Sequence, residues 1–321
     1  MAILTDSMER KLLDHIIGKA EYTRPGSLWM GLSTTAFTDS DSASAAYAKE
    51  PSGNAYARVQ VDDKVYYDHT NEDLRNTSSI DWAEATGAWG DIEYWGIFDG
   101  QSSSDDLVMH GSFSAATTVS SGDQFRISTG DFEINFPAAI YHGTRNSTTF
   151  ANWREQIGYR LGFDWSGNQD INEQFLFRSS ANASFDHPAL YLGVSASAFP
   201  TSGLTASEIS RSGTAYARVQ LSASNFGSAA TSSGTTTITN TSAIVFPEAT
   251  ASWGNISHFA IFRGEYVNTG TSTDRAETST YNSANYNANY PLISGALTTT
   301  KAVGSGDRLR FGIGDLVITA S

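Results

Sequence analysis

The sequence SGNAYARVQ at residues 52–60 returns as SGTAYARVQ at residues 212–220. Eight of the nine residues are identical, although 212 − 52 = 160 positions separate the two copies. Small and β-branched residues at 55, 57 and 59 alternate with the larger Tyr56, Arg58 and Gln60, and the second copy repeats this pattern, which is typical of a β-strand. A long peptide that occurs twice in one chain indicates that a larger unit has been duplicated.

Further segments repeat in the same order. LWMGLS at 28–33 matches LYLGVS at 190–195, and NTSSI at 76–80 matches NTSAI at 240–244. The sequence therefore predicts a tandem duplication, and residues kept in both copies are expected to form its scaffold. The repeated polar and aromatic positions pair as Tyr56 with Tyr216, Arg58 with Arg218, Glu84 with Glu248, Trp89 with Trp253, Asp123 with Asp307, and Asp131 with Asp315.

Short segments rich in β-branched and aromatic residues lie between clusters of Gly, Ser, Asp and Asn, which favours antiparallel β-structure. In the first copy we expect strands at 28–33, 55–61, 92–98, 107–113, 124–129 and 132–136. The predicted fold class is mainly β, with two tandem, related antiparallel β-sandwich domains, each preceded by one or more helical segments.

Apolar residues at helical spacing predict an amphipathic helix near the N-terminus. Asp6 with Glu9 suits a capping box, and Gly18 suits the end of the helix. We expect this helix to pack on its own domain. The expected domains are an N-terminal helix with a first sandwich at 1–137, a helical connector at 138–186, and a second sandwich at 187–321.

The second copy carries an insertion near 264–291, where the offset between the copies rises from 164 to 184. The insertion is rich in Asn, Ser, Thr and Tyr and lacks apolar periodicity, which predicts an exposed loop. Four of its tyrosines could offer an aromatic surface to a sugar or a protein partner. These candidate contact residues are Tyr266, Tyr281, Tyr286 and Tyr290.

The composition excludes several classes of partner. The formal net charge of −14 repels nucleic acid and anionic membrane surfaces. No apolar run reaches the length of about 18 residues that a membrane-spanning helix needs. Because the chain has no cysteine, thiolate chemistry and disulfides are also excluded.

The sequence carries no recognised catalytic motif, and its six histidines do not repeat between the copies. Asp39 and Asp41 with Glu50 partly match a calcium loop, but Ala43 and Ser44 stand where a ligand and a glycine are needed. We therefore expect no catalytic, cofactor or metal site. The repeated Trp, Arg and Asp positions could form a sugar platform, but turn chemistry and core packing favour a structural role.

Linked motifs carry a family resemblance. KLLDHIIGKAEYTRPGSLWMGLSTT, EPSGNAYARVQV, WAEATGAWGDIEYWGIFD and VSSGDQFRISTGDFEI occur in this order within the first copy. In this order they resemble a family of tailed-bacteriophage virion proteins known as phage tail fibre proteins. The resemblance covers nearly all of residues 1–136 and, with a degenerate start, residues 187–320. It implies a non-enzymatic structural protein of the virion, assembled in the cytoplasm of the host bacterium.

The resemblance leaves three roles open. The first is a tail or fibre appendage or adaptor that acts through protein–protein assembly with capsid or tail subunits. The alternatives are a capsid decoration protein and a module that binds a host receptor or surface glycan. A homo-oligomer is expected, and a trimer of two-domain chains would present six domains in a pseudo-sixfold arrangement.

Overall fold

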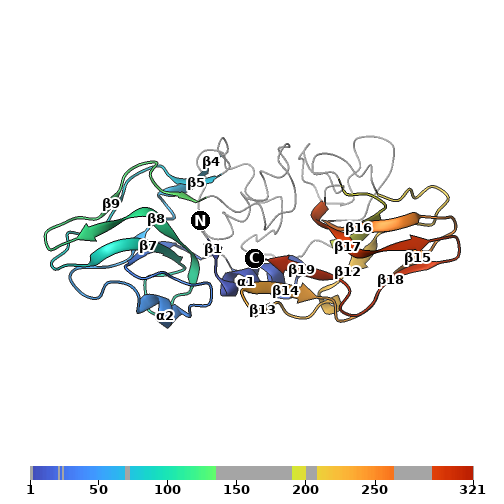
Figure 1. The fold of residues 1–321 in the computed structure, drawn as a ribbon, viewed down its shortest axis with the longest axis horizontal. Helices are drawn as coiled ribbons and strands as arrows, with labels where there is room; N and C mark the ends of the chain where they lie inside the picture. The colour runs from blue at the N-terminus through green and yellow to red at the C-terminus, as the bar shows by residue number, and fades with distance from the viewer. Residues whose placement is uncertain are drawn as a thin grey trace.

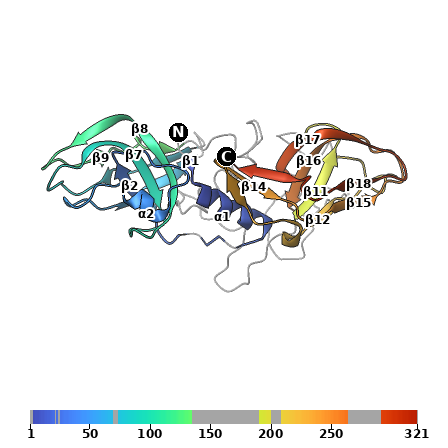
Figure 2. The ribbon, with the colours of Figure 1, turned by 60° about the horizontal axis from the view of Figure 1, so that its bottom comes forward.

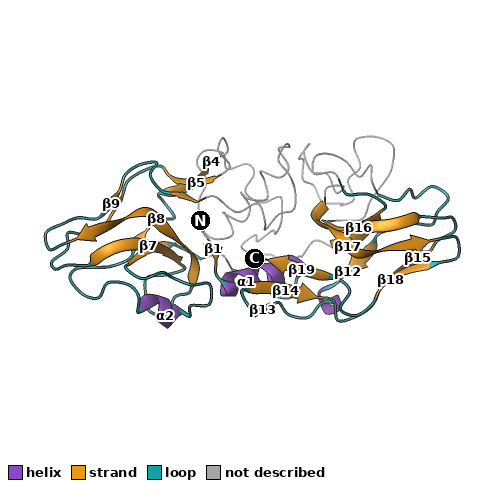
Figure 3. Cartoon of the chain, in the orientation of Figure 1, coloured by secondary structure: helices purple, strands orange, loops and turns teal. Residues whose placement is uncertain are grey.

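The computed structural model describes residues 3–20, 22–23, 25–68, 73–134, 190–199, 208–263 and 291–320. Antiparallel strands dominate these residues and group into two β-sandwich modules (Figures 1 and 3). We call the strands up to residue 134 module 1 and those from residue 190 onward module 2. The predicted fold class, mainly β with two tandem related domains, is confirmed.

Module 1 is built from three sheets around one core. Its largest sheet has the order β1 (Ile3–Leu4), β8 (Leu107–Val119), β7 (Gly90–Phe98), β2 (Trp29–Ser33) and β3 (Val59–Gln60). A second sheet has the order β10 (Glu133–Ile134), β5 (Asp73–Asn76) and β4 (Val65–Asp68), and a third pairs β6 (Ile80–Asp81) with β9 (Arg126–Ile127). Buried aromatic side chains, among them Trp82 and Trp95, fill the core between them.

Module 2 repeats this plan. Its largest sheet has the order β12 (Val219–Leu221), β11 (Leu190–Ser195), β16 (Gly254–Arg263) and β17 (Pro291–Val303). The second sheet has the order β13 (Ala230–Ser232), β14 (Thr235–Thr239) and β19 (Val317–Ala320), and the third pairs β15 (Ile244–Glu248) with β18 (Arg308–Phe311). A 3-10 helix, η3 (Ala223–Asn225), precedes β13.

The register of the strands repeats as well. Gly31 of β2 pairs with Gly96 of β7, and Gly193 of β11 pairs with Ala260 of β16. The β7–β8 pair shifts register between Ile92 and Tyr94, and the β16–β17 pair shifts register between Ile256 and His258. In each case the shift follows the second residue after the glycine that begins the strand. Such bulges increase strand twist, so both modules bend their longest hairpin at the same place.

The expected strand at 55–61 is wrong for most of its length, because only Val59–Gln60 is a strand. Asn54 and Ala55 have φ values of 53° and 60°, which form a left-handed turn in place of extended backbone. This turn directs Tyr56 and Arg58 toward the protein interior. The other strands form where expected with shifted ends.

Two helices of module 1 also depart from expectation. A short helix, α2 (Ala43–Tyr47), had no predicted counterpart. The N-terminal helix forms as α1 (Asp6–Ile17), but its N-cap is Thr5, whose side chain accepts a hydrogen bond from the N–H of Met8. Gly18 ends the helix in the left-handed conformation, as predicted.

Helix α1 packs against both modules, so the expectation that it packs on its own domain is only half right. Met8 and Leu12 belong to the core of module 1, whereas Leu13 and Ile17 belong to the core of module 2. Both views place α1 between the modules and beside β14 (Figures 1 and 2). The helix therefore joins two hydrophobic cores.

Two sequence predictions fall on residues that the structure does not describe. These are the helical connector at 138–186 and nearly all of the insertion at 264–291. Among the described residues, no helix has the length and hydrophobicity that crossing a membrane requires.

Candidate functional site: a tyrosine–arginine–glutamate clamp in each module

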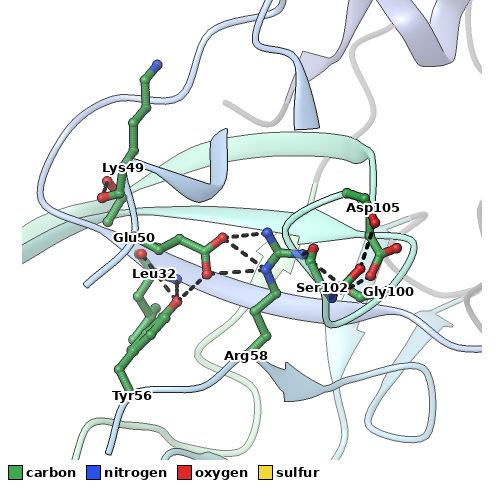
Figure 4. A network of polar contacts seen from close by, with 10 residues as sticks. Leu32, Lys49, Glu50, Tyr56, Arg58, Gly100, Ser102 and Asp105 are labelled. Atoms are coloured by element: carbon green, nitrogen blue, oxygen red, sulfur yellow. Dashed lines mark hydrogen bonds and ion pairs between the residues drawn. The ribbon is translucent and has the colours of Figure 1, made fainter. Parts of the chain in front are cut away.

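The repeated AYARVQ segment places one buried ion pair in module 1 (Figure 4). Arg58 Nη2 lies 2.6 Å from Glu50 Oε1, and the two side chains are only 1% and 2% exposed. Arg58 Nε donates to the same oxygen at 2.9 Å, so the guanidinium binds the carboxylate through two nitrogens. The Tyr56 hydroxyl donates to Glu50 Oε2 at 2.8 Å. We call these three residues and their module 2 counterparts the clamp.

Module 2 builds the same clamp. Arg218 Nη2 lies 2.7 Å from Glu208 Oε2, and Arg218 Nε donates to Oε1 at 2.8 Å. The Tyr216 hydroxyl donates to Glu208 Oε1 at 2.7 Å. The tyrosine and the arginine of the clamp are repeated positions in the sequence. In each module, the structure brings them together with a glutamate.

Sequence comparison between the copies missed both glutamates. Glu50 precedes its arginine by 8 residues, whereas Glu208 precedes its arginine by 10, so the two do not align at the offset of the AYARVQ repeat. The available signal was an acidic residue a short distance upstream of the repeated arginine in both copies. A buried arginine needs such a partner, because burying an unpaired charge is costly.

Aromatic rings complete each clamp. The guanidinium carbon lies 3.4 Å from the ring centroid of Phe98 in module 1 and 3.4 Å from that of Phe262 in module 2. On the other side, Tyr56 meets Trp89 edge-to-face, with centroids 5.3 Å apart. Tyr216 and Trp253 repeat this contact at 5.3 Å. The repeated tryptophans thus pack against the clamp tyrosines in the core.

A glycine leaves room for each glutamate. A Cβ atom at Gly31 would lie 2.8 Å from Glu50 Oε2 and 2.9 Å from the Phe98 ring. A Cβ atom at Gly193 would lie 2.7 Å from Glu208 Oε1 and 2.7 Å from the Phe262 ring. The glycine in LWMGLS and LYLGVS is therefore required by the clamp, because any side chain there would displace the carboxylate or the ring.

The electrostatics of the clamp suit a fixed structural crosslink. Burial raises the pKa of Glu50, while the hydrogen bonds and charge of Arg58 act in the opposite direction. Burial and the Glu50 carboxylate raise the pKa of Tyr56 well above its usual value, and burial beside Glu208 does the same for Tyr216. Both phenols therefore stay protonated and donate to the carboxylate, and neither is suited to act as a base.

The clamp of module 1 also fixes the loop between β7 and β8. Arg58 Nη1 donates to the carbonyl oxygens of Gly100 and Ser102 at 2.9 and 3.1 Å (Figure 4). In module 2, β16 ends at Arg263, directly after the clamp ring Phe262, and the insertion follows. The four candidate contact tyrosines, Tyr266, Tyr281, Tyr286 and Tyr290, lie outside the described residues.

The repeated aspartates lie in the turns between the last strands. Asp123 Oδ2 accepts from the N–H of Ser120 at 2.8 Å, and Asp307 Oδ2 accepts from the N–H of Gly304 at 2.7 Å. Asp315 accepts from the N–H of Gly312 at 2.7 Å, and the N–H of Asp131 donates to the Ser128 carbonyl. These are turn-closing contacts.

The repeated glutamates outside the clamp lie on the surface. Glu84 is exposed, and Glu248 forms an exposed pair with Arg308 at 3.3 Å. Among the described hydrogen bonds, none joins Glu84 or Glu248 to a residue of the clamp.

The partial calcium pattern is used for other contacts. Asp39 Oδ1 lies 2.9 Å from His110 Nε2, Asp41 forms an ion pair with Lys49 at 2.6 Å, and Glu50 belongs to the clamp. Within the described part of the chain, no group of three or more His, Cys, Asp or Glu residues could hold a metal ion.

Comparison with known proteins identifies one family. The family model described as Gp80, podophage GP4 fiber I protein gp80, matches residues 3–135 and again residues 174–319. The first match covers module 1 and the second contains module 2, so each module corresponds to one copy of the family unit. No curated protein matches the sequence.

Proposed function

Because the chain belongs to the Gp80 family of podophage fibre I proteins, we propose that it is an adaptor or appendage subunit that joins other proteins of the phage tail. Family membership makes it a structural protein of the phage fibre and assigns it to the virion. The adaptor role, its oligomeric state and its position on the particle are part of the proposal.

The repeated clamp is the observation that carries this proposal. Both modules keep the same arginine, tyrosine and glutamate in the same geometry, with the arginine side chains 1% and 0% exposed. Charges that are fully paired inside a core stabilise a scaffold and are not available to a substrate. A rigid scaffold that occurs twice in one chain can present two similar surfaces to neighbouring subunits.

Symmetry extends the same argument to the assembly. A homo-oligomer repeats the two related but unequal modules around a ring of neighbouring subunits, which a single chain cannot do. Three chains would supply six modules. We propose modules at 1–137 and 187–321 with a connector at 138–186, acting as a homo-oligomer such as a trimer. We also propose a non-enzymatic role, supported by the family and by the use of the repeated polar residues in scaffold contacts.

Electron cryo-microscopy of purified virions tests this function. The expected result is density for both modules on the tail or fibre in contact with other virion proteins, and loss of that density from particles made without the gene. Density spread over the capsid faces would instead establish the decoration role. Absence of the chain from wild-type particles would refute both roles.

Binding of a host receptor or glycan is a second candidate, favoured by the position of the insertion. It starts two residues after Phe262, whose ring lies against the buried guanidinium of Arg218, so it begins at a fixed point of module 2. Shortening residues 264–290 should then reduce adsorption of virions to host cells without reducing the number of copies per particle. Alanine replacement of Ser102 and Ser104 in the corresponding module 1 loop serves as the control.

A further inference from the structure

Module 2 exposes apolar side chains on β15, on β19 and in the turn between β18 and β19. Of the four large hydrophobic residues that are exposed in the described part of the chain, three lie here: Val245 at 44%, Ile313 at 71% and Val317 at 44%. Val245 and Val317 point outward because the residues on either side of each in its strand are buried in the module 2 core. Ile313 lies in the turn between β18 and β19.

The same positions are polar in module 1. Asp81 stands where module 2 has Val245, because Ile80 and Ile244 are matching buried residues of the NTSSI and NTSAI repeat. Glu133 stands where module 2 has Val317, one residue before the buried Ile134 or Ile318. Thr129 in turn corresponds to Ile313. Module 2 has therefore replaced three polar surface positions with apolar ones.

Two exposed ion pairs are lost with these replacements. In module 1, Asp81 forms an ion pair with Arg126, its partner in the β6–β9 register. Glu133 forms an ion pair with Arg75 at 2.9 Å across the β5–β10 register. In module 2, Thr239 takes the place of Arg75 and pairs with Val317.

The arginine of the other pair is retained. Arg310 occupies the position of Arg126 and lies opposite Val245 in the β15–β18 register. Across the described residues, its guanidinium forms no ion pair or hydrogen bond. Lys301, which replaces Thr117, lies on β17, with its Nζ 3.2 Å from the carbonyl oxygen of Arg310 on β18.

These exchanges change the charge of the surface. In module 1, Asp81, Glu133, Arg75 and Arg126 sum to zero, whereas their module 2 counterparts, Val245, Val317, Thr239 and Arg310, carry one positive charge. Lys301 adds a second positive charge, and its Nζ lies 3.9 Å from the carboxylate of Asp315. Asp315 and its counterpart Asp131 occur in both modules and do not alter the difference. A cationic, apolar surface is unusual on a chain whose formal net charge is −14.

We propose that Val245, Ile313, Val317, Arg310 and Lys301 form a docking surface, the module 2 patch, for an acidic surface with an apolar centre on a different virion protein. This inference rests on the proposed adaptor function. The partner supplies the carboxylate that Asp81 supplies in module 1, and its apolar centre covers the two valines and the isoleucine. The buried core of a protein interface is more apolar than the rest of the surface, and arginine is enriched there.

Charge argues against a second copy of this chain as the occupant. A twofold contact places each patch against its own copy, which would bring Arg310 and Lys301 close to the same two residues of the neighbour. Like charges opposed in an interface disfavour association, so the unpaired Arg310 disfavours contact of the patch with a second copy of itself. An acidic partner faces no such repulsion.

Restoring the module 1 residues tests the patch. Phage is produced with the double variant Val245→Asp and Val317→Glu as its only version of the chain, and copies per purified particle are counted by quantitative mass spectrometry. Incorporation should fall about tenfold or more, as when central anchors of an interface are lost. The matched control is Asp81→Val with Glu133→Val in module 1, which should leave incorporation unchanged.

A second variant separates binding from folding. Arg310→Glu changes only an exposed charge, so its thermal unfolding should match wild type while its incorporation falls. If all the patch variants are incorporated as well as the wild-type protein, and the wild-type protein is present on particles, the patch is overturned but the adaptor function is not. Absence of wild type from particles would instead overturn the adaptor function. A free wild-type dimer, seen by sedimentation and abolished by Arg310→Glu, would show that a second copy is the occupant and overturn the proposal.

Discussion

Asp14 Oδ1 accepts a hydrogen bond of 2.8 Å from the main-chain N–H of Ala229, although 215 residues separate the two in the sequence. Asp14 belongs to α1 of module 1, and Ala229 precedes β13 of module 2. Arg10 adds a bond of 3.0 Å from Nη1 to the hydroxyl of Thr231. Helix α1 therefore fixes the second module with polar contacts as well as apolar ones.

Leu13→Ala should lower the free energy of unfolding by about 2–5 kcal/mol, because Leu13 is buried in the module 2 core although it belongs to module 1. Chemical denaturation followed by circular dichroism measures this loss. Lys11→Ala, which removes an ion pair with Asp106 whose side chains are 37% and 40% exposed, is the control and should cost less than about 1 kcal/mol. Equal losses in the two variants would show that α1 is not held by module 2.

Arg58→Ala should destabilise the protein by about 3–5 kcal/mol, since it leaves the Glu50 carboxylate buried without its partner. Arg218→Ala should do the same in module 2, where the partner is Glu208. Arg75→Ala is the exposed control. Its pair with Glu133 is 34% and 38% exposed, so the loss should stay below about 1 kcal/mol in the same unfolding measurement.

Gly31→Ala should be destabilising by about 1–3 kcal/mol, because the added methyl group meets the Glu50 carboxylate and the Phe98 ring below 3.0 Å. Gly26→Ala is the control, because Gly26 precedes β2 and a Cβ atom there would meet nothing within 4 Å. Thermal unfolding of the two variants compares them directly. A Gly31→Ala protein as stable as Gly26→Ala would contradict the close packing of the clamp.

Glu9→Gln should stabilise the protein more at neutral than at acid pH. Burial raises the pKa of Glu9, with Asp6 and Asp39 adding to the rise and a hydrogen bond to Thr236 opposing it. A carboxyl group whose pKa is higher in the folded state favours folding when protonated, and that stability is lost as pH rises through the folded pKa, above the ordinary value of 4.5.

The measurement is the difference in melting temperature between Glu9→Gln and wild type at about pH 4, below the ordinary carboxyl pKa, and at about pH 7, well above it. The difference should be small or negative at the lower pH and larger at the higher pH. A constant difference would show that the carboxylate is not destabilised in the folded protein.

The repeat made the fold predictable. Identical segments in the same order indicated two β-sandwiches, and the residue pattern located five of the six strands expected in the first copy to within a few positions, whereas β1, β4, β5 and β6 had no predicted counterpart. The strand at 55–61 failed because the alternation of Tyr56 and Arg58 with alanines is also produced by a turn that buries both side chains. Period-two patterns report which residues are buried and do not specify backbone angles.

The clamp was half predictable. The sequence identified the tyrosine, arginine and tryptophan by repetition, but the glutamates lie in segments whose length differs between the copies. The docking of α1 on module 2 could not be predicted, because the sequence pattern specifies only that the helix has an apolar face. The pattern does not distinguish Leu12 from Leu13. Which core each residue enters depends on how the two modules sit in space.

The position of α1 has a consequence for synthesis. This helix leaves the ribosome well before β13 and β14, the strands beside it, and translation of the intervening chain takes on the order of tens of seconds in bacteria. During that time Leu13 and Ile17 face water without the core that later covers them. The nascent helix can meet another chain emerging from the same messenger RNA before its own partner exists, so the fidelity of assembly depends on the order in which the polypeptide is made.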